Sequence, residues 1–186
     1  MSLVKDLYGP LTDLIGVWEG DKGLDIVPSD DRGTEENLFR ERIVFEQMSP
    51  VQNHEQTLNV LRYSTMVYRI GQGFTFHEEL GYWSWEPKTQ EIMRCFLVPR
   101  GIALIAGGKA DKDAKEFRLE AKAGSPTFGI CNNPFLEREF KTVSFEYNFK
   151  FLDKDRFSYE EDSVLKMPGK SDLFHHKDKN ALKRVG

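Results

Sequence analysis

Cysteine and histidine are scarce in this sequence of 186 residues, which has two of the former and four of the latter. Cys95 and Cys131 lie in unrelated contexts without a CxxC spacing, so we expect two free, buried thiols rather than a disulfide. The sequence also lacks an HExxH motif, a GxxxxGK[ST] phosphate loop and a recognisable Ser/His/Asp arrangement. A zinc site held by side chains alone is therefore not indicated, and we assign no catalytic residue.

Long apolar runs and basic runs are missing as well. No segment approaches the ~20 apolar residues of a membrane-spanning helix, and residues 1–16 do not have the pattern of a signal peptide. The net charge of -4, without any run of Lys or Arg, argues against a nucleic-acid surface. We expect a cytoplasmic protein that has neither nucleic acid nor membrane as its partner.

Aromatic residues are plentiful, with 14 Phe, 6 Tyr and 3 Trp. They favour strands, and from about residue 16 to 166 the apolar residues mostly alternate with polar ones. The run 140–151 is the clearest example, since every second residue from Val143 to Phe151 is apolar. Tight turns such as 71–73 and 99–101 separate the runs. We predict one all-β domain over 1–186, an antiparallel meander that closes into a barrel and so has no exposed edge strand.

Four segments depart from this alternation. The polar residues 25–37 and the Gly/Pro/Asn-rich residues 124–137 are predicted to be long loops that border a binding site. Residues 6–15 have apolar residues at helical spacing and predict a short N-terminal helical turn. Residues 171–184 follow Pro168 and Gly169, offer Ser171 or Asp172 as a helix cap, and predict a short C-terminal helix.

The predicted tail helix contains His175 and His176, half of all the histidines. Because neighbouring helix residues lie ~100° apart around the axis, only one of the two can face a pocket. From spacing alone, a solvated pair on a surface helix is the ordinary interpretation. The functional alternative is that one of them binds an iron, for which a single histidine suffices when a porphyrin supplies the other nitrogens.

Two further stretches are candidates for a pocket wall. On a strand, His77 shares a face with Glu79, Gly81 and Trp83, although a lone strand histidine is more often a hydrogen-bonded structural residue than a ligand. Residues 98–108 are small and apolar around Gly101. They predict a tight hairpin between core strands, or a wall that leaves room for a flat ligand.

Taken in order along the chain, these stretches resemble the nitrobindin family, haem-binding β-barrels related in shape to lipocalins and fatty-acid-binding proteins. A GxWxGxG-like start is matched by Gly16, Trp18 and Gly20. An HxExGYW-like strand is matched by His77, Glu79, Gly81, Tyr82 and Trp83. A strand pair with a small-residue turn follows at 91–108, and the chain ends in a histidine-containing segment at 176–184.

The resemblance implies a barrel of about ten strands that binds haem b. It implies that His176 is the iron ligand, with His175 the substitute if the register differs by one residue. His77, Phe76 and the small residues around Gly101 would line the haem pocket. Family members are associated with nitric oxide binding and with isomerisation of peroxynitrite, so a peroxynitrite isomerase-like activity is implied as well.

Two alternatives stay open. The same barrel could carry a lipid or another apolar molecule without haem, or it could serve as an interaction module without a ligand. In the haem hypothesis and in the carrier hypothesis the partner is a small molecule. The sequence leaves the oligomeric state open, a homodimer included.

Overall fold

The alternating sequence folds into a sheet that closes on itself. The structure, a computed structural model, describes residues 7–186. Twelve strands form the antiparallel sheet: β1 (Gly16–Pro28), β2 (Thr34–Gln47), β3 (Val51–Asn53), β4 (Gln56–Arg69), β5 (His77–Glu86), β6 (Glu91–Val98), β7 (Ile102–Lys109), β8 (Glu116–Lys122), β9 (Ile130–Asn132), β10 (Lys141–Asp153), β11 (Arg156–Lys166) and β12 (Phe174–Arg184).

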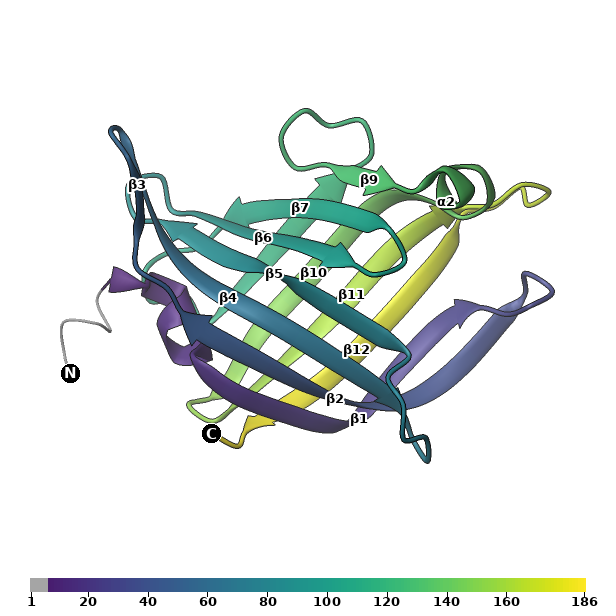
Figure 1. Ribbon diagram of the computed structural model, residues 1–186, viewed down its shortest axis with the longest axis horizontal. Helices are drawn as coiled ribbons and strands as arrows, with labels where there is room; N and C mark the ends of the chain where they lie inside the picture. The colour runs from purple at the N-terminus through teal and green to yellow at the C-terminus, as the bar shows by residue number, and fades with distance from the viewer. Residues whose placement is uncertain (1–6) are drawn as a thin grey trace.

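Ten of these strands form a ring (Figure 1). The order is β2-β1-β12-β11-β10-β8-β7-β6-β5-β4, and a pairing of β2 with β4 closes it. The short strands β3 and β9 lie outside the ring and pair with β4 and β7. This confirms the predicted closed antiparallel barrel, in which every barrel strand has a partner on both sides.

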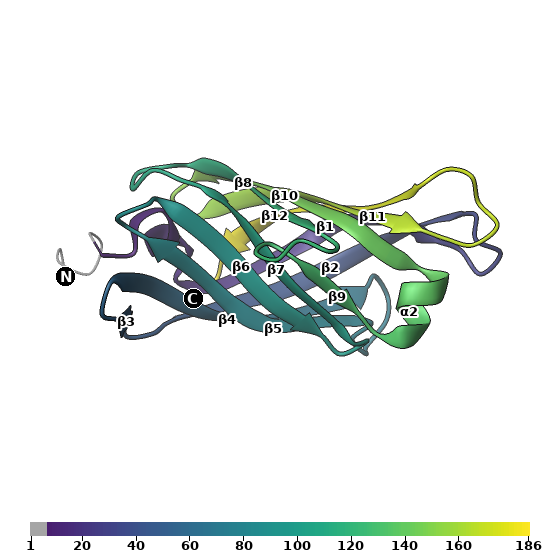
Figure 2. The same cartoon turned by 90° about the horizontal axis from the view of Figure 1, so that it is seen from above.

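One end of the barrel is closed by the 3-10 helix η1 (Gly9–Leu14). Leu11 and Leu14 are fully buried there, and the indole of Trp18 donates a hydrogen bond to the Leu14 carbonyl at 2.6 Å. The predicted helical turn at 6–15 is thus a shorter 3-10 helix, and residue 6 lies outside the described residues. In Figures 1 and 2, η1 is at the left end, whereas the tips of the β1–β2 and β11–β12 connections and α2 (Pro134–Glu139) are at the right end. Of the described helices, none is long and apolar enough to cross a membrane.

The C-terminal segment is a strand, so the helix predicted for 171–184 is wrong. β12 pairs with β1 on one side and with β11 on the other. Asn180 and Leu182 point into the barrel, whereas Lys179 and Lys183 point outward. The helix cap and the basic end of this segment are local signals. Two ladders of hydrogen bonds outweigh them, because β1 and β11 would otherwise both be open edges.

The two segments predicted to be long loops are mostly ordered elements. In 25–37, β1 continues to Pro28 and β2 begins at Thr34, which leaves only the turn 29–33. In 124–137, a loop precedes β9 and α2. Asn133 caps α2 by accepting hydrogen bonds from the backbone N–H groups of Phe135 and Leu136. The two cysteines are free, as predicted, but neither is fully buried: Cys95 is half-buried and Cys131 is exposed.

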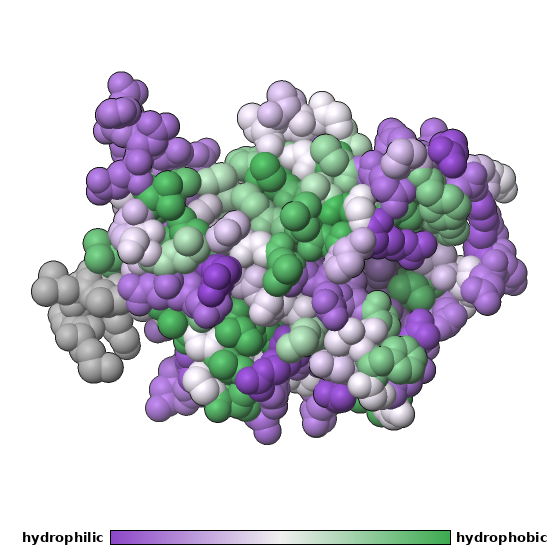
Figure 3. Space-filling model, in the orientation of Figure 1, coloured by the Kyte–Doolittle hydropathy of each residue, from purple (hydrophilic) through white to green (hydrophobic). Residues whose placement is uncertain are grey.

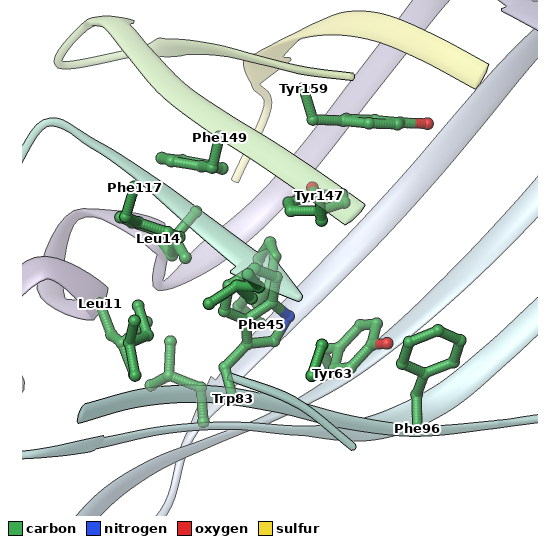
Figure 4. Packing of buried hydrophobic residues seen from close by; sticks show 14 of the residues in the cluster. Leu11, Leu14, Phe45, Tyr63, Trp83, Phe96, Phe117, Tyr147, Phe149 and Tyr159 are labelled. Atoms are coloured by element: carbon green, nitrogen blue, oxygen red, sulfur yellow. The ribbon is translucent and has the colours of Figure 1, made fainter. Parts of the chain in front are cut away.

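Aromatic side chains fill the half of the barrel next to η1 (Figure 4). Trp83 lies at the centre of this layer and is 2% exposed. Its ring makes edge contacts with five others, at centroid distances between 5.7 and 6.5 Å: Phe45, Tyr63, Phe117, Tyr147 and Phe149. Such pairs add to the hydrophobic burial itself. This half of the interior is therefore closed and tightly packed.

A buried polar cluster lies beside the aromatic layer and ties β2 to β11 and β12. Glu41 is 4% exposed, and its Oε1 accepts hydrogen bonds from the Tyr159 hydroxyl and the Asn180 amide, each at 2.9 Å. Burial raises the pKa of Glu41 to about 7, although both hydrogen bonds act in the opposite direction. The carboxyl group consequently binds its proton more tightly in the folded protein than in the unfolded chain.

The strand assignment of the tail predicts an alternating effect of mutations. Leu182 is 1% exposed and Lys183 is exposed. Leu182→Ala should lower the free energy of unfolding by about 2–5 kcal/mol, because it opens a cavity in the barrel. Lys183→Ala should change it by less than about 0.5 kcal/mol. Urea denaturation followed by circular dichroism measures both, and equally small losses would contradict the strand.

The raised pKa of Glu41 predicts how stability depends on pH. Between its ordinary value of 4.5 and about 7, the folded protein holds more protons than the unfolded chain, so this group destabilises the fold as the pH rises. Glu41→Gln keeps the accepting oxygen and removes the charge. The variant and the wild type should be about equally stable near pH 5, with the variant more stable by up to ~3 kcal/mol near pH 8.5. Parallel stability curves over this range would show that the pKa is not raised.

Candidate functional site

The candidate site lies at the end of the barrel opposite η1. There the inward-facing residues are only half-buried, in contrast to the packed interior behind them. We call this end the mouth. Its inward-facing residues come from eight strands and are Val27, Asn37, Arg69, His77, Val98, Ile102, Ser163 and His176.

The floor of the mouth is an ion-pair network centred on Arg94, which is 6% exposed. Its guanidinium contacts Glu79 at 2.5 Å and Glu161 at 3.1 Å, and its Nε donates to the Tyr63 hydroxyl at 3.0 Å. Burial acts to raise the pKa of Glu79, but the charge of Arg94, aided by hydrogen bonds, outweighs it and holds the pKa at about 2. Burial raises the pKa of Glu161, and the positive charge of Arg94 offsets this increase only in part.

His77 lies at the edge of this network, on the inward face that the alternation of its strand predicts. Its Nε2 is 3.3 Å from the Glu79 carboxylate. Burial acts to lower the pKa of His77, but the hydrogen bond and the charge of Glu79 outweigh it and raise the pKa above its usual value. With 37% of its side chain exposed, His77 can hold a proton at Nε2 and still reach the mouth.

The histidine doublet divides between the two faces of β12. His175 points outward and its side chain is 54% exposed, with Nδ1 at 2.8 Å from Asp162. His176 points into the mouth and is 33% exposed, with Nε2 at 3.0 Å from Asp25. The two histidines point to opposite faces because successive residues of a strand do so, and not because of the helix geometry from which the prediction was made. The structure directs His176 inward.

Phe76 and Gly101 lie near the mouth in different ways. Phe76 is half-buried just before β5, and the guanidinium of Arg69 lies 5.1 Å above its ring. Gly101 lies in the turn between β6 and β7 with a φ of +85°. A Cβ at this position would come within 3.1 Å of Asn133. The turn therefore requires a glycine there, and Gly101 lies at the rim rather than in the wall.

Several functional residues were missed from the sequence. Asp25 lies in a segment predicted to be a loop, and Arg69 ends a strand whose polar face gave no signal. Arg94 could have been found, because it alternates with Ile92 and Phe96 on an otherwise apolar, buried face. A charge in such a position is buried only when it is paired.

Three carboxylates form a row across neighbouring strands beside the network. Asp178 is the register partner of Asp25 on β1 and of Glu161 on β11, and all three point inward. Burial, reinforced by the charges of Glu161 and Asp25, raises the pKa of Asp178 well above its usual range. Even so, residues 7–186 contain no group of three or more His, Cys, Asp or Glu side chains arranged to hold a metal ion. An ion bound here would need ligands beyond these side chains.

Two grooves are lined mostly by outward-facing residues, but the first also includes Glu79, Val98 and Ile102 of the mouth and its floor, and the second includes Glu161 and Asp178. The first, of about 490 Å³, runs along β5, β6, β7 and β9 and reaches Gly101 at the rim. Leu80 and Leu97 are 66% and 61% exposed there. Figure 3 shows apolar surface over the region of β5, β6 and β7. The other, of about 360 Å³, crosses β10, β11 and β12 and is lined by charges of both signs. Neither groove contains His77 or His176, so the histidines favour the mouth as the site.

Comparisons with known proteins agree with this architecture. Residues 7–184 match a family described as "THAP4-like, heme-binding beta-barrel domain". The fold is similar to the crystal structure of Rv2717c from M. tuberculosis, with a TM-score of 0.67, 21% sequence identity and 95% of each chain covered. A search of curated protein sequences gave no match. The family match confirms the haem-binding barrel that the sequence motifs suggested, and the chain belongs to the family of THAP4-like, haem-binding β-barrel domains.

Proposed function

We propose that this protein binds haem b in the mouth of the barrel through His176, and that it binds nitric oxide or converts reactive nitrogen species such as peroxynitrite. One observation carries the proposal: in a family of haem-binding barrels, the inward histidine of the tail strand lies at the open end. We extend the proposal to a cytoplasmic protein whose partners are haem and a small ligand of its iron.

The donor chemistry of the mouth fits haem. A porphyrin supplies four nitrogens, so a single neutral imidazole completes a five-coordinate iron that has one position open to a small ligand. His176 supplies such an imidazole. Its Nε2 is 3.0 Å from Asp25, a contact that an iron at this nitrogen would replace.

The walls and the rim fit the rest of the cofactor. Val27, Val98 and Ile102 offer apolar contact to a flat ring. Two buried donor atoms, Nε of Arg69 and Nδ2 of Asn37, have no hydrogen-bond partner within the described residues. They belong to inward-facing positions near the ends of β4 and β2, which are paired strands. A haem propionate is an acceptor of the kind that such donors need.

The residues of the floor contribute through protons and charge. Protonated His77 donates its Nε2–H to Glu79 and has a second N–H, at Nδ1, from which a ligand in the mouth could accept a hydrogen bond. Glu79 keeps its negative charge because of Arg94, and so it holds His77 in place and favours its protonated form. As a residue of the pocket, His77 would therefore supply an N–H donor to the bound ligand.

The runner-up, a carrier of a fatty acid or another long apolar molecule, fits the interior less well. Such a ligand needs an extended apolar cavity, and a fatty acid carries a negative charge of its own. Here aromatic rings fill one half of the barrel, and the floor of the mouth carries Glu79, Glu161 and Arg94. An alkyl chain would have to displace these groups or lie against them, at a cost in desolvation.

Titration with hemin tests the proposal. The wild-type protein should give a shifted Soret band with one site per chain. His176→Ala should weaken hemin binding by more than the ~10–100-fold that removal of an outer-shell partner costs, because it removes the axial ligand itself. His175→Ala is the matched control on the outer face, and it should bind hemin like the wild type. Circular dichroism verifies that both variants are folded.

Three results would contradict this proposal. Absence of a Soret shift in the wild type would exclude haem, and an additional uptake of a displaceable fluorescent fatty acid would then favour the carrier. Equal losses in His175→Ala and His176→Ala would exclude the assignment of His176. Hemin binding without any effect of nitric oxide on the spectrum would exclude the proposed ligand.

A further inference from the structure

A bulge in β1 sets which polar side chains meet on one side of the mouth. The register of β1 against β2 shifts between Gly20 and Gly23, and after the shift the odd-numbered residues of β1 point inward. Asp25 is one of them, with Asn37 on β2 as its register partner. On the other side of β2, Asn37 is the diagonal neighbour of Arg69, because the inward residue next to Asn37 pairs with Arg69. Asp25 and Arg69 therefore lie on opposite sides of Asn37.

Two donor atoms in this corner of the mouth lack an acceptor. Nδ2 of Asn37 and Nε of Arg69 are buried, and neither has a hydrogen-bond partner within residues 7–186. Asp25 is opposite Asn37 in the β1–β2 ladder, yet Nδ2 of Asn37 donates no hydrogen bond to it. Most buried donors in folded proteins are paired, since an unpaired one keeps its full desolvation cost. The two atoms therefore favour an acceptor that comes from outside the chain.

The guanidinium of Arg69 is held in place while its charge is only weakly paired. It lies 5.1 Å above the ring of Phe76, whose backbone N–H donates to the Val67 carbonyl of β4 at 3.0 Å. A guanidinium stacked on a ring keeps its N–H donors free in its own plane. Its one ion pair among the described residues is with Glu35, at 3.8 Å, which is longer than a hydrogen bond. A better-placed carboxylate can replace Glu35, whose side chain is 45% exposed.

We propose that Arg69 and Asn37 form a carboxylate site at the rim of the mouth, which binds a propionate group of a porphyrin lying in the mouth. The inference rests on the proposed function for the identity of the ligand. A carboxylate has two acceptor oxygens, which suits the planar fork of an Arg together with one amide N–H. On the floor, the cation of Arg94 is already paired with Glu79 and Glu161, so it is not available to another carboxylate. The site therefore decides which way the ligand faces, with its acid groups at the rim.

The outer face of the same two strands supplies a matched control. Arg40 lies 4.0 Å above the ring of Tyr68, its register partner, so this pair repeats the stacking of Arg69 away from the mouth. Arg69→Gln and Arg40→Gln each remove one stacked guanidinium, but only the first removes a charge from the rim. Glu35→Gln removes the carboxylate that competes for Arg69. Circular dichroism verifies that all three variants are folded.

Metal-free protoporphyrin IX tests the site without the iron. Its fluorescence reports binding, and its dimethyl ester keeps the ring but lacks the two charges. The wild type should bind the diacid at least about tenfold more tightly than the diester, because only the diacid offers Arg69 an ionised acceptor. Arg69→Gln should abolish this preference, and Arg40→Gln should keep it. Glu35→Gln should bind the diacid more tightly than the wild type does.

A spectroscopic measurement locates the contact and a second ligand distinguishes its source. In ¹H–¹⁵N spectra, the Nε–H signal of Arg69 and the side-chain amide signals of Asn37 should shift strongly with the diacid and less with the diester. A fatty acid also joins a carboxylate to an apolar body, so cis-parinaric acid and its methyl ester are titrated in the same way. A charge preference that depends on Arg69 for cis-parinaric acid but not for protoporphyrin would overturn the propionate assignment.

The outcomes also separate this site from the proposed function. If hemin binds through His176 but Arg69→Gln keeps the preference of the wild type for the diacid, or the wild type has none, the carboxylate site is overturned and the haem site stands. If hemin gives no Soret shift, the proposed function fails. Binding of protoporphyrin or cis-parinaric acid that depends on Arg69 would then still support the carboxylate site, and its absence would overturn both.

Discussion

The guanidinium of Arg94 is the group on which the interior of this barrel depends. It neutralises Glu79 and Glu161 at the level where the packed aromatic half gives way to the mouth. It also lies over the rings of Phe96 and Tyr147, at 4.4 and 4.5 Å from their centroids, so the same group packs as an aromatic neighbour. Removal of this cation would take the Arg partner away from two buried carboxylates and leave Glu79, among the described residues, with only His77 and the Tyr63 hydroxyl. Breaking a buried ion pair in this way costs more than replacing the whole pair by apolar residues. Both the fold and the charge of the mouth therefore rest on a single side chain.

Parity along the strands decides which polar residues meet in that interior. The register of β12 against β11 is continuous, which keeps His176, Asp178 and Asn180 on one face. The bulge in β1 reverses parity within the neighbouring strand and adds Asp25 to this face. The inward-facing residues of the site are therefore odd-numbered in β1 after the bulge and even-numbered in β12. The reversal in β1 occurs between Gly20 and Gly23, near the start of the strand.

The barrel and much of its face assignment follow from the sequence, because alternation is a local signal. The strand that begins at His77 and the apolar run 140–151 lie where their period of two predicts. The helix predicted for the tail was wrong because a capping residue and basic charges are also local signals. The hydrogen-bonding partners of β12 include β1, which is distant in sequence, so no local signal reports them. The network around Arg94 has the same origin, since its partners come from β4, β5 and β11. No short stretch of the sequence contains both Arg94 and the carboxylates that stabilise it when it is buried.

The arrangement of charge at the mouth bears on what can enter it. Arg69 and Asn37 offer unused donors at the rim, while carboxyl groups crowd the floor. An anionic group is therefore favoured at the rim and disfavoured in the depth, which orients a cofactor with acidic substituents toward solvent. The same gradient separates the two chemistries of the proposed function. Nitric oxide is neutral and would enter without electrostatic cost, whereas the peroxynitrite anion would approach the carboxyl groups of the floor against like charge unless it took up a proton. Because the pKa of His77 is raised, this side chain is the candidate proton donor for such an anion. The carboxylate of Glu79 on the floor is what raises that pKa, so the two residues would act together.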